Sequence, residues 1–111
     1  MLNRQAMAAL AEFELIVLLA VLRSGDLAYS VAVRNEIERR TGRRASLGAV
    51  HLTLDRLERK GLLVSSLGDP TPQRGGRAKR YYLPTRTGVR VLKAECRVIS
   101  RMWSGLGLLA D

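Results

Sequence analysis

The chain has 111 residues, the usual size of one small domain and too few for two separate cores. Hydrophobic residues make up 47% and charged residues 26%, a balance that supports a packed core and excludes a wholly disordered or collagen-like chain. The 19 lysines and arginines outnumber the 10 acidic residues, giving a net charge of +9. Such an excess favours a polyanionic partner, with nucleic acid ahead of an acidic membrane surface.

The positive charge is concentrated after the first third of the chain, since residues 34–101 hold 17 basic and six acidic side chains. One cysteine and one histidine exclude an intramolecular disulfide and a zinc finger, so we expect no metal and no other cofactor. The apolar run Leu15–Leu22 is shorter than the roughly 20 residues needed to cross a bilayer, and Glu12 and Glu14 before it are untypical of a signal peptide. We expect a cytoplasmic protein with no membrane partner.

Three helices are predicted before residue 61. Residues 12–22 are apolar nearly all round, which is typical of a helix covered on more than one side. Between residues 29 and 40 apolar side chains recur every four positions, indicating a second, amphipathic helix that Gly42 ends. Ser46 is a good N-cap for a third helix, which ends before Gly61.

The third helix has two contrasting faces. Its apolar stripe, expected to face the core, consists of Leu47, Val50, Leu54 and Leu57. The opposite face is predicted to mix small, apolar and basic side chains, namely Ala49, Leu52, Thr53, Arg56 and Lys60.

A β-hairpin and a last helix complete the prediction. Residues 62–68 and 78–83 are short runs with valine and tyrosine, separated by a long basic connection. Thr85 can cap a final helix to about Leu106, in which two apolar stripes lie side by side. The first includes Leu92, Cys96, Ile99 and Trp103, and the second Val91, Val98 and Met102. Because two stripes exceed what one helix needs against its own small domain, we expect this helix to form a homodimer.

The second and third helices, joined by a short glycine-containing turn, form the helix-turn-helix arrangement that fits a major groove, and the hairpin resembles a wing. The residues of the recognition helix expected at DNA are Ser46, Gly48, Ala49, Leu52, Thr53 and Arg56. Leu52 would contact a thymine methyl group, Thr53 a base edge or phosphate, and Arg56 a guanine or phosphate. Simple exposure of Thr53 and Arg56 to water is the alternative.

Cations of the turn and wing are expected to bind phosphates, namely Arg43, Arg44, Arg74, Arg77 and Lys79. The adjacent pair Gly75-Gly76 would let backbone N–H groups approach the duplex. For the two turn arginines, a favourable charge near the end of the second helix is the alternative interpretation.

Catalysis is not expected. His51 and Asp55, four positions apart, could pair as a base and its orienting carboxylate, but no nucleophile motif accompanies them. Cys96 is interpreted as a packing thiol rather than a redox sensor. Trp103 is interpreted as a core or dimer contact, with the wall of an effector pocket as the alternative.

The chain resembles the PadR family of bacterial transcription regulators from about Leu10 to Leu106. The motifs that carry the resemblance are Leu10-Ala-Glu-Phe-Glu14, Asp26-Leu-Ala-Tyr29, Ser46-Leu-Gly-Ala-Val50, Leu54-Asp-Arg-Leu-Glu-Arg-Lys-Gly-Leu62 and Arg74-Gly-Gly-Arg-Ala-Lys-Arg-Tyr-Tyr82. The resemblance implies a dimeric winged-helix repressor of the subgroup with a single C-terminal helix, which makes the dimer, and a wing that lies along the DNA. His51 and Leu52 stand where the family usually has tyrosine and threonine.

The expected fold class is mainly α with a small β-hairpin: a single domain, residues 1–111, with a winged helix-turn-helix over residues 10–84 and a dimerisation helix over residues 85–106. The expected function is sequence-specific binding of a double-stranded DNA operator by a homodimeric repressor that competes with polymerase. A small-molecule effector near the dimer interface would release it. The alternatives are a winged-helix protein-interaction module and, less favoured because aromatic residues are few, an RNA-binding winged helix.

Overall fold

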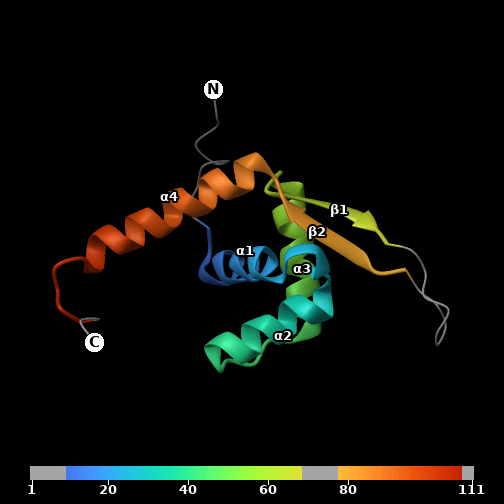
Figure 1. Ribbon diagram of the computed structural model, residues 1–111, viewed down its shortest axis with the longest axis horizontal. Coiled ribbons are helices and arrows are strands. Elements are labelled where there is room, and N and C mark those ends of the chain that lie inside the picture. Colours follow the sequence, from blue (N-terminus) through green and yellow to red (C-terminus); the bar gives the residue numbers. More distant parts are fainter. Residues whose placement is uncertain (1–9, 69–77, 109–111) are drawn as a thin grey trace.

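The computed structural model describes residues 10–68 and 78–108, and its elements follow the predicted order (Figure 1). The elements are α1 (Glu12–Ser24), a short 3-10 helix η1 (Gly25–Leu27), α2 (Ser30–Thr41), α3 (Leu47–Arg59), β1 (Leu63–Leu67), β2 (Arg80–Pro84) and α4 (Arg86–Trp103). The prediction of a mainly helical fold with one hairpin and a long C-terminal helix is confirmed.

Local signals explain why the helix boundaries agree closely with the sequence. Gly42 ends α2 in the left-handed conformation, with φ of 72°, and its N–H donates to the carbonyl oxygen of Glu38 at 3.0 Å. Thr85 caps α4, since its hydroxyl oxygen accepts a hydrogen bond from the N–H of Gly88 at 2.9 Å.

The core is shared by all the main elements, with α1 packed against α2, α3, β2 and α4. The fully buried large side chains are Val17, Leu18, Val21, Val33, Val50, Leu54, Leu57 and Leu63. Three of them belong to α1 and three to the predicted apolar stripe of α3, so both core predictions are confirmed. Within residues 10–68 and 78–108, no helix has the length and hydropathy needed to span a bilayer.

The hairpin is hydrogen-bonded to the segment just before α2. β1 and β2 pair antiparallel, from Leu63 opposite Pro84 to Leu67 opposite Arg80. On the other side of β2, the N–H of Tyr82 donates to the carbonyl oxygen of Ala28 at 2.9 Å. This bond joins the segment before α2 to the hairpin. β2 therefore has hydrogen-bond partners on both edges, β1 on one and Ala28 on the other.

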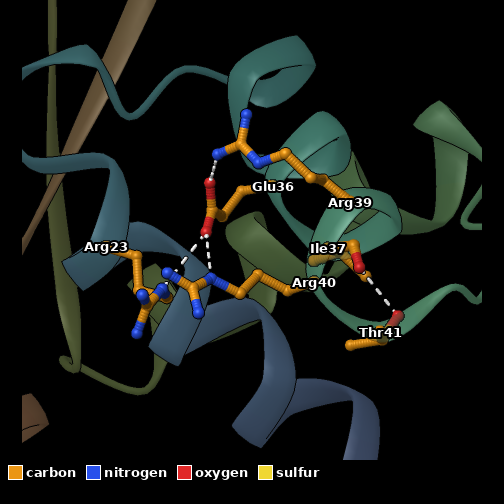
Figure 2. A network of polar contacts seen from close by, with 6 residues as sticks. All are labelled: Arg23, Glu36, Ile37, Arg39, Arg40 and Thr41. Carbon is orange, nitrogen blue, oxygen red and sulfur yellow. Dashed lines mark hydrogen bonds and ion pairs between the residues drawn. The ribbon is translucent and has the colours of Figure 1, made fainter.

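A buried carboxylate ties α1 to α2 (Figure 2). Glu36 is only 7% exposed, and its Oε2 accepts hydrogen bonds from Arg23 Nε at 3.1 Å and Arg40 Nε at 3.2 Å. Arg39 binds the other carboxylate oxygen. Because Arg23 belongs to α1 and the other groups to α2, the Arg23–Glu36 pair joins the two helices, and all three pairs help to compensate the cost of burying the charge.

The last helix is buried only at its beginning. Gly88 lies against the carbonyl group of Leu62, and Val91 and Leu92 are the last buried residues of α4. Beyond them the helix extends away from the other elements (Figure 1). Cys96 is exposed in the single chain, so the described residues do not provide the expected packing of its thiol.

Candidate nucleic-acid interface

The first turn of α3 is held in place and left open to solvent. Ser46 Oγ accepts a hydrogen bond from the N–H of Ala49 at 3.1 Å, as its N-cap role predicts. The N–H of Ala45 donates to Glu38 Oε2 at 3.0 Å, which anchors the preceding turn on α2. An added Cβ at Gly48 would meet no heavy atom of the described residues within 4 Å. The start of α3 therefore has room for a close neighbour.

The exposed face of α3 is rotated slightly from the predicted one. Its members are Gly48, His51, Leu52, Asp55, Arg56 and Arg59. Leu52 is 67% exposed, a large apolar side chain directed to solvent between polar neighbours. Asp55 Oδ2 forms an ion pair with Arg59, one turn further along the same helix, at 2.8 Å. Among the described residues, Asp55 therefore pairs with Arg59 and not with His51.

The prediction that Thr53 lies on the outer face is wrong. Thr53 is 4% exposed, and its hydroxyl group donates a hydrogen bond to the carbonyl oxygen of Ala49 at 2.8 Å. The side chain can be buried because the hydroxyl group finds this partner within its own helix and only the methyl group meets the core. Lys60 is exposed as predicted, but its ammonium group pairs with the carboxylate of Glu14.

Cations of the hairpin lie beside α2 and α3. Lys79 Nζ stands 4.3 Å from the ring centroid of Tyr29, and this ring meets that of Tyr81 edge to face at 5.7 Å. Arg80 donates to Ser65 Oγ at 3.0 Å across the hairpin. Arg74 and Arg77 lie outside the described residues.

A hollow of about 470 Å³ separates the loop end of the paired strands from α2 and α3. Its lining includes Tyr29 and Ser30 at the start of α2, His51 of α3, and Lys79 and Arg80 of the hairpin. Sequence reasoning placed His51 on the helix surface but missed that it and Tyr29 line this hollow. His51 stands three residues after Gly48, and this helix spacing puts both on the same face of α3. No local pattern in the sequence places Tyr29 beside Lys79.

The turn supplies two further cations, both exposed. Arg43 forms an ion pair with Glu12 at 3.2 Å, which fixes the turn against the start of α1. Arg44 forms no ion pair with any described residue. Together with Lys79, these groups flank the open end of α3 with positive charge.

Comparisons with known proteins agree with this arrangement. Residues 18–94 match the family described as the transcriptional regulator PadR-like family. The chain belongs to this family. No curated protein matches the chain in sequence.

Solved structures with a similar fold include two PadR family regulators and a winged-helix DNA-binding protein. A regulator from Eggerthella lenta is 24% identical, with a TM-score of 0.66 over 89% of this chain and 83% of that one. A regulator from Clostridium difficile is 25% identical, with a TM-score of 0.62 over 85% and 97%. The winged-helix DNA-binding protein F93 from STIV is 16% identical, with a TM-score of 0.68 over 88% and 98%.

The predicted dimer residues of this PadR-like chain fall into two groups. Leu92 is 5% exposed and packs in the core of its own chain, which corrects its assignment to a dimer interface. Cys96, Ile99 and Trp103 are exposed, Ile99 at 53% and Trp103 at 46%. The predicted dimer residues that are exposed therefore begin about one turn beyond Leu92.

Proposed function

We propose that this PadR-like protein binds double-stranded DNA sequence-specifically and represses transcription as a homodimer. The observation that carries the proposal is the open first turn of α3, with the cations Lys79 and Arg80 at the loop end of the paired strands nearby. Residues 10–84 would form the DNA-binding part, and α4, which ends at Trp103 and not at the predicted Leu106, would form the dimer.

The exposed face of α3 would lie in the major groove. Gly48 lets the helix backbone approach closely, and the helix dipole near Ser46 favours a phosphate. Leu52 would contact a thymine methyl group and Arg56 a guanine edge or a phosphate. Ala49 is partly buried and contributes to the close approach, while Thr53 supports the helix from inside and is no longer proposed as a base contact.

Sequence-independent affinity would come from cations on both sides of α3. Arg43 and Arg44 in the turn, and Arg74, Arg77 and Lys79 in the hairpin, are the proposed phosphate ligands. Lys79 supports this role because it is exposed beside the hollow between the hairpin and α3.

Dimerisation would use the exposed apolar face of α4. Large apolar side chains remain open there, namely Val98 (55%), Ile99 (53%), Met102 (76%) and Trp103 (46%). Such a patch on a soluble protein marks an interaction surface, and a second copy related by a two-fold axis would present two recognition helices to two half-sites. A small-molecule effector near Trp103 would alter their separation and release the operator, which ends competition with polymerase.

Selection of bound duplexes from a random pool, followed by titration at several salt concentrations, tests the proposal. We expect one enriched motif with two half-sites, and binding that weakens steeply as salt rises. Absence of an enriched motif together with salt-insensitive binding would favour the protein-interaction module instead.

A further inference from the structure

The outer side of α4 carries a stripe of five cations, which we call the α4 basic stripe: Arg86, Arg90, Lys93, Arg97 and Arg101. All five are exposed. Their spacings of four, three, four and four residues place them on one side of the helix. At about 1.5 Å per residue the stripe runs for roughly 22 Å.

No acidic group of the described residues neutralises this stripe. The six ion pairs among those residues all lie outside α4. Glu95 is the one acidic residue of α4 and stands nine positions after Arg86, about half a turn around the helix from it. Like charges three and four residues apart repel one another, and Arg86 in the first turn also opposes the helix dipole. A bound polyanion would remove both unfavourable effects.

The stripe lies away from the proposed operator contact. The hydroxyl group of Thr85 donates to the carbonyl oxygen of Gly61 at 2.7 Å, so α4 begins at the C-terminal end of α3. Gly48 is at the other end of that 13-residue helix, about 20 Å away. The duplex held by the first turn of α3 therefore does not account for the stripe.

A dimer formed through α4 would also leave the middle of the stripe open. Val91 and Leu92, which face the body of the chain, and Ile99, which would face the partner, lie roughly opposite the stripe on the helix. A second copy, with a net charge of +9, is a poor electrostatic match for it.

We infer that the α4 basic stripe binds the phosphate backbone of a second duplex segment, so that one operator-bound dimer bridges two stretches of DNA. The inference rests on the proposed function. Four of the five cations are arginines, which bind phosphates bidentately, and the length of the stripe allows contact with several phosphates. DNA is favoured over an acidic protein because neighbouring duplex is already concentrated around an operator-bound dimer.

A bridging assay tests the inference. A labelled duplex carrying both selected half-sites occupies the two recognition helices, and beads coated with unlabelled random duplex capture any dimer that binds a second segment. Wild-type protein should retain the label on the beads. The variant Arg90→Gln/Lys93→Gln/Arg97→Gln should lower capture by about tenfold or more while its affinity for the labelled duplex in solution changes by no more than about threefold.

A charge-preserving control is the variant Arg90→Lys/Lys93→Arg/Arg97→Lys, which should bridge like wild type. Wild-type protein that binds the labelled duplex but is not captured would overturn the inference alone. Equal capture of the glutamine variant, or capture by polyglutamate beads in place of duplex beads, would also overturn it. Failure to bind the labelled duplex at all would instead overturn the proposed function.

Discussion

Lys60 Nζ lies 2.7 Å from Glu14 Oε2 and joins the end of α3 to the start of α1 across 46 positions of sequence. Burial disfavours the charged form of Glu14, but hydrogen bonds from Lys60 and from the N–H of Ala11, with the positive charges of Lys60 and Arg56, outweigh this and lower its pKa. Ionised Glu14 therefore stabilises the fold at pH values above its ordinary pKa. This contribution is lost as the pH falls through the lowered pKa of the folded state.

Replacing Lys60 by methionine should reduce the free energy of unfolding by about 1–3 kcal/mol at pH 7, because the buried carboxylate of Glu14 loses its charged partner. Urea denaturation at neutral pH and at pH values below the ordinary glutamate range measures the effect. The difference from wild type should shrink in acid, where Glu14 is protonated in both proteins. Arg59→Met, which breaks the exposed pair with Asp55, is the control and should cost less than about 1 kcal/mol. A loss for Lys60→Met that is independent of pH would contradict this account.

The substitution Gly48→Ala should raise the free energy of unfolding and weaken DNA binding at the same time. The added methyl group meets no atom within the described structure, and alanine favours the helix by roughly 0.5–1 kcal/mol. The same methyl group would stand between the helix backbone and the duplex. Thermal denaturation and operator titration on the same variant separate the two effects. Unchanged operator affinity would show that the duplex does not approach α3 at Gly48.

Leu52 and Thr53 should differ sharply in their effect on base preference. Leu52→Ser removes an exposed apolar side chain and should cost about 1–3 kcal/mol on the selected operator, with a smaller loss on random duplex. Thr53→Val keeps the buried shape and removes only a hydroxyl group bonded within its own helix, so operator preference should not change. Competition titrations with both duplexes distinguish the variants. A preference altered by Thr53→Val alone would place the base-reading face elsewhere.

The substitution Ile99→Glu should separate the proposed dimer without unfolding the chain. Ile99 is half exposed in the single chain, so the new charge is solvated there, but in a dimer interface it would be buried without a partner. Sedimentation and circular dichroism at micromolar concentration should show a folded monomer with much weaker operator binding. Val64→Glu changes a side chain of similar exposure on β1 and should remain dimeric. A wild-type monomer with full affinity for a single half-site would refute the dimeric architecture.

The parts of the fold that sequence predicted well depend on neighbours in the chain. Gly42, Ser46 and Thr85 each act on backbone groups within four residues, so their effect on helix boundaries is visible in the sequence. Spacing along α3 likewise identified its core stripe, because Val50, Leu54 and Leu57 have no polar group that could direct them outward.

The remaining features depend on contacts distant in sequence or on amphipathic side chains. Thr53 carries both a methyl and a hydroxyl group and lies at the border between the apolar and polar faces of α3. The sequence therefore does not decide whether its side chain is buried or exposed. The apolar pattern of α4 continues past Leu92 without a break, so it gives no sign of where the body of the chain ends. Lys79 reaches Tyr29 only because β2 returns to the start of α2.

The hydrogen bond from Tyr82 to Ala28 has a consequence for operator architecture. Together with the packing of Tyr81 on Tyr29, it joins β2 to the start of α2, so in the proposed dimer these two elements of each protomer would meet the duplex as one unit. One extra base pair between the half-sites rotates one footprint relative to the other by about 35°, at roughly 10–10.5 base pairs per turn. In the proposed dimer this rotation would be taken up between the protomers, so the spacing of half-sites that the protein tolerates would depend on how far the paired α4 helices can twist relative to each other.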